Sequence, residues 1–227
     1  MKEKLYNQSP AAILKSALRA SVGLFAFGFC EYVTIKANIG VGPWEAFTLG
    51  LSGSLGLSYG TVAIAISFTI VFINILLKER IGFGMLLDAV IVGLSVDFFL
   101  ALDPIPACTG ILSGLAMYIT AIFAMEFTVW FYMEARLGCG PRDCLMIALG
   151  KRLKKVSIGT VLALMMITVT VLGFILGGPI GIGTVCCAVL SGPFMQIVFR
   201  ILKFDATGIV HQSIFETIAV FKNKDRL

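Results

Sequence analysis

Long apolar runs dominate this chain of 227 residues, in which 58 % of the side chains are hydrophobic. A run of about 18 or more apolar residues can cross the roughly 30 Å hydrocarbon core of a bilayer as a helix. Six runs predict membrane-spanning helices, over residues 14–36, 60–77, 83–101, 109–133, 159–176 and 183–202. These spans leave no room for a separate soluble domain. We therefore expect residues 1–227 to form one all-α polytopic membrane domain in contact with the lipid bilayer.

A short motif, Gly-x-Gly-Pro-x-acid, occurs twice at a separation of about 98 residues. The first copy runs from Gly40 to Glu45 and the second from Gly138 to Asp143. Other matches keep the same register, shifted by one residue after the motif: Phe25 with Phe123, Ser58 with Ser157, Gly82 with Gly181, and Gly93 with Gly192. This pattern predicts two internal repeats, over about 14–101 and 109–202. Internal repeats are common among transporters.

The symmetry of the repeats depends on two short apolar segments, 44–54 and 143–149. Segments of this length are more often re-entrant or interfacial than spanning. If they do not cross, each repeat has three spans and the second repeat is inverted; if they cross, the repeats are parallel. With three spans each and the N-terminus inside, 17 of the 18 basic residues lie inside, and only Lys36 lies outside. With four spans each the division is 13 against 5, so the positive-inside rule favours inverted repeats with both chain ends in the cytoplasm.

The motif itself combines a helix break with a carboxylate. Glycine allows backbone angles that other residues avoid, and proline suits the first position of a helix. The predicted motif backbone consists of Gly40, Gly42, Pro43, Gly138, Gly140 and Pro141. Glu45 and Asp143 then fall in a first helical turn, where the helix dipole favours negative charge. One interpretation is that these acids only complement the helix starts, and another is that both motifs lie simply at the membrane interfaces.

A third interpretation makes the motifs a binding site. Non-helical backbone at membrane depth is tolerated beside protein or water, and broken helices near the midplane are where transporters bind substrates and ions. Glu45 and Asp143 would then share a cavity, with Trp44 and Arg142 at matching positions beside them. Arg142 would clamp an anionic group, or Trp44 would stack on an apolar or cationic one.

Four further acids lie inside apolar runs: Glu31, Asp88, Asp97 and Glu126. A charge at membrane depth is expensive, so each is a functional candidate. Glu126 is in the middle of its span and is the strongest of the four, although a protonated, hydrogen-bonded structural role stays open. Asp88 and Asp97 are nine residues apart on one helix and should face opposite sides.

Several classes of function are disfavoured. The net charge of +5 arises from basic residues at span ends, where they meet lipid headgroups, so nucleic acid is not an expected partner. The cysteines lack metal-ligand spacing, and the one histidine, His211, lies in the tail, so we expect no metal and no other cofactor. Ser/His and HExxH pairings are absent from the sequence, and we expect no enzyme activity.

The tail over residues 203–227 carries Val210, Ile214, Ile218 and Phe221 at near-helical spacing. This predicts an amphipathic helix on the cytoplasmic membrane face or, as an alternative, a helix that docks a partner. The pairs Gly23 with Gly28 and Gly110 with Gly114 permit close helix packing, within one chain or in a homo-oligomer.

The doubled motif, with the downstream Ser-x-Gly and Gly-x-Gly-Thr, resembles the YczE/YyaS/YitT family of bacterial integral membrane proteins over about residues 15–203. In that family the acid is usually Asp in both copies; Asp143 agrees and Glu45 is longer by one methylene. The resemblance implies a protein of the bacterial cytoplasmic membrane without an established substrate. The expected function is a permease or exporter of a small molecule or ion by alternating access of the two repeats. The alternative is a non-transporting accessory protein that assists or anchors an enzyme system.

Overall fold

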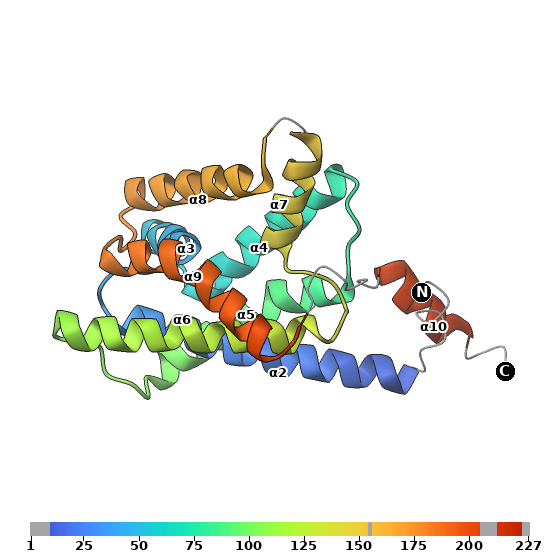
Figure 1. Ribbon diagram of the computed structural model, residues 1–227, viewed down its shortest axis with the longest axis horizontal. Coiled ribbons are helices and arrows are strands. Elements are labelled where there is room, and N and C mark those ends of the chain that lie inside the picture. Colours follow the sequence, from blue (N-terminus) through green and yellow to red (C-terminus); the bar gives the residue numbers. More distant parts are fainter. Residues whose placement is uncertain (1–9, 154–155, 205–212, 224–227) are drawn as a thin grey trace.

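The computed structural model describes residues 10–153, 156–204 and 213–223, and these residues form nine α-helices and no strand (Figure 1). Six of the helices are long and apolar enough to span a membrane: α2 (Pro10–Lys36), α4 (Tyr59–Leu76), α5 (Phe83–Leu102), α6 (Ile111–Met133), α8 (Ile158–Ile175) and α9 (Ile182–Ile201). The six predicted spans are therefore confirmed as helices. Their outer faces expose large apolar side chains, such as Leu14, Phe72 and Phe174, as contact with lipid requires.

The two motifs each begin a short helix. α3 (Pro43–Leu55) has 13 residues and α7 (Pro141–Arg152) has 12. At about 1.5 Å per residue, each is shorter than roughly 20 Å and cannot cross the hydrocarbon core alone. Gly42 and Gly140 precede them with nearly identical extended angles, φ −61° and ψ 163° against φ −60° and ψ 159°. Both helices therefore begin at a Gly-Pro step, as the motif predicts.

The C-terminal end of α7 is tied to the loop between α4 and α5. Glu79 in that loop accepts hydrogen bonds from Lys151 at 2.7 Å and from Arg152 at 3.3 Å. The hydrogen bond from Lys151 holds the pKa of the Glu79 carboxyl below its ordinary value. Arg152 also donates to the carbonyl oxygen of Leu77. These contacts extend α7 beyond the predicted 143–149 segment and fix its end beside the α4–α5 loop.

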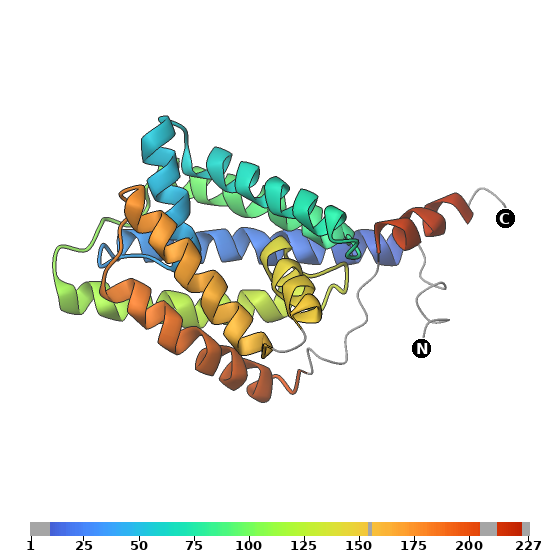
Figure 2. The same cartoon turned by 90° about the horizontal axis from the view of Figure 1, so that it is seen from above.

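α2 and α6 lie side by side and run in opposite directions (Figures 1 and 2). At one end, the Cys108 amide before α6 donates to the carbonyl of Lys36 at the end of α2, at 2.8 Å. At the other end, Arg19 near the start of α2 forms an ion pair with Glu134 at the end of α6. The first helices of the two predicted repeats are thus antiparallel, as inverted repeats require.

Local geometry recurs at matched positions of the two halves. Left-handed backbone occurs at Asn38 and Arg136, at Gly40 and Gly138, and at Lys78 and Gly177. The hydroxyls of Ser58 and Ser157 each accept the amide of the residue three positions on, at 3.2 and 3.1 Å, and so cap α4 and α8. This recurrence supports the predicted repeat.

The packing of the helices also matches between the two halves. α2 packs on α5 as α6 packs on α9, α3 packs on α8 as α7 packs on α4, and α3 packs on α4 as α7 packs on α8. The α4–α5 packing has no comparable α8–α9 counterpart among the described residues. The second half is therefore more open between its last two spans than the first half.

The tail contains one described helix, α10 (Ile214–Asn223), which packs on α2 beyond one end of the bundle (Figure 1). The Ile214 amide donates to the carbonyl of Ile81 at 2.8 Å. Ser213 and Glu216 exchange side-chain hydrogen bonds with each other's amides, which caps the helix start. Phe215 is 80 % exposed and Ile218 is 45 % exposed, so an apolar face stays uncovered. Val210 and His211 lie outside the described residues.

Candidate functional site

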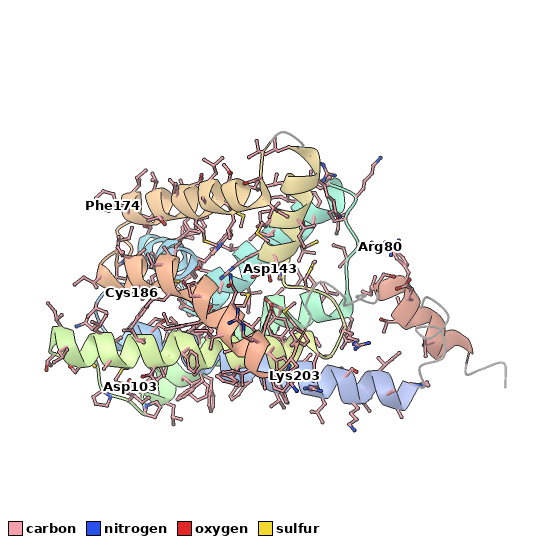
Figure 3. All side chains as sticks on the ribbon, in the orientation of Figure 1. Arg80, Asp103, Asp143, Phe174, Cys186 and Lys203 are labelled. Carbon is pink, nitrogen blue, oxygen red and sulfur yellow. The ribbon has the colours of Figure 1, made fainter. Side chains whose placement is uncertain are left out.

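A cavity of about 220 Å³ lies where α7 begins. Six of the predicted site residues line it: Trp44, Glu126, Gly140, Pro141, Arg142 and Asp143. Figure 3 places Asp143 near the middle of the bundle, between Phe174 and Asp103 toward one end and Arg80 toward the other. The structure therefore brings residues of both motifs to the wall of one cavity.

Arg142 joins the two motifs. Its guanidinium carbon Cζ lies 4.8 Å from the centre of the Trp44 ring, within cation–π range. Its Nη1 lies 3.6 Å from Oε1 of Glu45. Glu45 is not among the residues that line the cavity, but it lies against two that do, Arg142 and Glu31. Residue 142 of the second motif thus contacts residues 44 and 45 of the first.

The glycines of the motifs allow close backbone contacts. A Cβ atom on Gly40 would lie 2.4 Å from the amide nitrogen of Gly181, and Gly40 has φ +93°. Gly138 has φ +130° and lies beside Gly82, where a Cβ would be 3.0 Å from Cα. Gly140 and Pro141 line the cavity themselves. The motif backbone therefore holds the starts of α3 and α7 against α9 and α5.

Four carboxyl groups from four helices line the cavity: Glu31, Asp88, Glu126 and Asp143. Glu31 is 1 % exposed, and its Oε2 accepts a hydrogen bond from the Tyr59 hydroxyl at 3.2 Å. Its Oε1 has no hydrogen-bond partner among the described residues, and neither has Oε2 of Glu126, which is 5 % exposed. The indole Nε1–H of Trp44 is likewise unpartnered among them.

The sequence marks Glu31 and Asp88 as charges at membrane depth but does not assign them to the site. The spacing argument for α5 agrees with the structure, since Asp88 lines the cavity and Asp97 does not. Asp97 instead accepts hydrogen bonds from the Gly60 amide at 2.7 Å and the Ser58 hydroxyl at 2.6 Å. It fixes the start of α4, so it is bonded within the protein.

Matched positions of the two predicted repeats meet on the cavity wall. Five such pairs line it: Phe27 with Met125, Glu31 with Val129, Trp44 with Arg142, Ala63 with Leu162, and Ser67 with Met166. The first three pairs are 98 residues apart in the sequence, as the two motifs are, and the last two pairs are 99 residues apart, as the matches after the motif are. This pairing of residues supports the predicted repeat. A search for acids alone misses this, because Glu31 is the one acid among these ten residues.

Known proteins are similar to this chain over nearly all of the region that contains the six spans. Residues 14–200 match the model of a family described as "Family of unknown function (DUF6198)". The chain is 31 % identical over 180 residues to "Uncharacterized membrane protein YczE" of Bacillus subtilis, which covers 77 % of this chain and 80 % of that protein. It is 29 % identical over 185 residues to an "Uncharacterized protein" of Haemophilus influenzae, covering 80 % and 84 %.

A third relative, "Uncharacterized protein YyaS" of Bacillus subtilis, is 28 % identical over 188 residues, covering 80 % of this chain and 91 % of that protein. No solved structure matches the chain. The resemblance to YczE and YyaS is confirmed, and six spans agree with the word membrane in the name of the first relative. This chain is a membrane protein of the DUF6198 family.

Proposed function

We propose that the protein is a permease or exporter for a small molecule or ion, working by alternating access of two inverted repeats. The observation that carries the proposal is the cavity wall, which five pairs of repeat-matched residues line together. Transporters built from inverted repeats bind their substrates between the repeats, at the ends of broken helices. The relatives come from bacteria, so the cytoplasmic membrane is the proposed location.

The site residues have distinct roles in this proposal. Trp44, Arg142 and Asp143 contact the substrate, and Glu45 holds Arg142 in place. Glu126 carries a coupling proton, because it is buried in the middle of α6 and one of its oxygens is unpartnered among the described residues. Alternating access would open the cavity to each side of the membrane in turn.

Replacing Asp143 with Asn tests the proposal. Asn keeps the shape of the side chain and removes the charge, so we expect transport in reconstituted vesicles to fall by about 100-fold or more while the protein still reaches the membrane. Asp103→Asn is the matched control, because Asp103 lies in the loop between α5 and α6 outside the cavity. Loss of the Asp143→Asn protein from the membrane, with normal control protein, would instead assign Asp143 a structural role only.

The accessory-protein alternative rests on α10. Its exposed Phe215 and Ile218 offer an apolar face at the end of the bundle, suited to a membrane surface or a partner helix. Co-purification of an enzyme that disappears when residues 204–227 are deleted would favour this function over transport.

A further inference from the structure

The charges around the cavity do not balance. Glu31, Asp88, Glu126 and Asp143 line it, and Glu45 lies just behind Arg142, which is the one basic residue on the wall among the described residues. Arg142 is already in contact with Glu45 and with the Trp44 ring. A buried carboxylate without a counter-ion is costly, so the surplus carboxyl groups need protons or a positively charged ligand. An anionic ligand would add to the surplus.

Two of these carboxyl groups are incompletely hydrogen-bonded within the described residues. Oε1 of Glu31 and Oε2 of Glu126 are buried and have no hydrogen-bond partner in the part of the chain that the structure describes. Both side chains are more than nine-tenths buried and both line the cavity. A buried polar atom normally finds a partner, so the oxygen of Glu126 marks a place where a donor is missing, whereas the Glu31 carboxyl lies within hydrogen-bonding range of the Glu45 carboxyl. The ligand should therefore bring N–H or O–H donors as well as positive charge.

Apart from Ser67 and Tyr132, the remaining wall is apolar, and much of it is polarisable. Four methionines line the cavity together with Trp44 and Phe27: Met125, Met165, Met166 and Met195. Aromatic rings attract cations, and methionine side chains adapt to irregular apolar groups. The volume of about 220 Å³ exceeds the roughly 150 Å³ of an apolar cavity that binds benzene. It suits a molecule of one ring or a short alkyl chain.

We propose that this cavity binds a small protonated organic amine, whose ammonium group lies among the carboxyl groups of Glu31, Asp88, Glu126 and Asp143 and whose apolar part lies against Trp44 and the methionines. The inference rests on the proposed permease function, because it names the substrate class of that same cavity.

Ligand binding to the purified protein tests the substrate class by isothermal titration calorimetry. The probes are benzylammonium, neutral benzyl alcohol and anionic benzoate, which share one ring and differ in charge. We expect benzylammonium to bind at least about tenfold more tightly than the other two. Equal or tighter binding of benzoate or benzyl alcohol, or no binding of benzylammonium, would overturn the inference.

Variants locate the binding site. Glu31→Gln and Glu126→Gln each keep the side-chain shape, and each should weaken benzylammonium binding by about tenfold or more. Glu134→Gln is the matched control, because Glu134 pairs with Arg19 outside the cavity, and its affinity should equal that of the native protein. Unchanged affinity in both cavity variants would overturn the inference. The probe series on the native protein needs no variant, so a variant that fails to fold leaves the test intact.

Transport of the same probes separates this inference from the proposed function. Benzylammonium that binds but is not carried into vesicles would uphold the ligand class and contradict the permease. Transport of benzoate in preference to benzylammonium would uphold the permease and contradict the ligand class.

Discussion

Arg142 is the residue on which the two halves of the site converge. Its guanidinium contacts Trp44 and Glu45 of the first motif while its own backbone begins α7. The side chains of Arg142 and Glu45 are 24 % and 14 % exposed, so both charges are largely removed from solvent. Removing one charge leaves the other without its partner, which costs more than the pair itself contributes.

A double-mutant cycle measures this coupling. We expect Arg142→Gln to lower the free energy of unfolding by about 1–3 kcal/mol, since it leaves Glu45 unpaired. Adding Glu45→Gln should restore about 1 kcal/mol of that loss. Arg142→Lys keeps the charge but not the planar contact with Trp44, and should fall between the native protein and Arg142→Gln. Thermal unfolding in detergent would show the order, and strictly additive losses would contradict the pairing.

The sequence predicts part of this arrangement at the residue scale. Trp44, Arg142 and Asp143 can be found because the doubled motif places them at equivalent positions, and Glu126 because a mid-span acid is costly. Glu31 and Asp88 cannot be assigned in the same way, because α2 and α5 are apolar on nearly every face. Hydrophobic periodicity then says little about which side of a helix faces the interior.

At the element scale, the short helices α3 and α7 depend on glycines that let neighbouring backbones approach closely. Gly40 combines a left-handed φ of +93° with a contact that leaves no space for a Cβ beside Gly181. Gly53 lies in the interior of α3, and a Cβ added there would have no atom within 4 Å. Position 40 therefore requires glycine, whereas position 53 has space for a larger side chain.

Alanine substitution should separate these two positions. Gly40→Ala should destabilise the protein by about 2 kcal/mol or more, from left-handed strain and from the contact with Gly181. Gly53→Ala should be neutral or stabilising by up to about 1 kcal/mol, because alanine is the better helix former. Thermal unfolding of both proteins gives the comparison. Equal stability of the two variants would show that the Gly40 contact with Gly181 is not formed.

The short helices also show what element-level patterns can predict. The Gly-Pro step correctly locates the starts of α3 and α7, since it reflects local backbone chemistry. The predicted segment 143–149 ends before α7 does, because Lys151 and Arg152 are held by Glu79, a contact 72 and 73 positions away in sequence. Apolar length alone cannot reveal a polar helix end that a distant loop stabilises.

At the scale of the whole molecule, the six spans and the antiparallel first helices agree with three spans in each half. Composition is sufficient to predict the spans, because the bilayer demands long apolar helices whatever the tertiary packing. Composition cannot predict the position of the cavity, since it depends on how α3 and α7 enter between the spans. The repeat register supplies the link, because it indicates which residues occupy equivalent positions in the two halves.

Topology in cells tests the inverted arrangement. A single cysteine replaces the exposed Arg80 between α4 and α5, in a protein lacking the native cysteines Cys30, Cys108, Cys139, Cys144, Cys186 and Cys187. We expect an impermeant thiol reagent to label it only after the cells are permeabilised, because three spans per repeat place this loop inside. Labelling of intact cells would require four spans per repeat.

Access to the cavity tests the central claim most directly. Ser67 on α4 is 7 % exposed and lines the cavity, and Ser67→Cys changes one atom of its side chain. In the same cysteine-free protein, this cysteine would be treated with a positively charged, impermeant thiol reagent, in intact cells and in inside-out vesicles. Alternating access predicts labelling from both sides of the membrane, slowed by benzylammonium. Labelling from one side only, or from neither, would contradict a transport cavity.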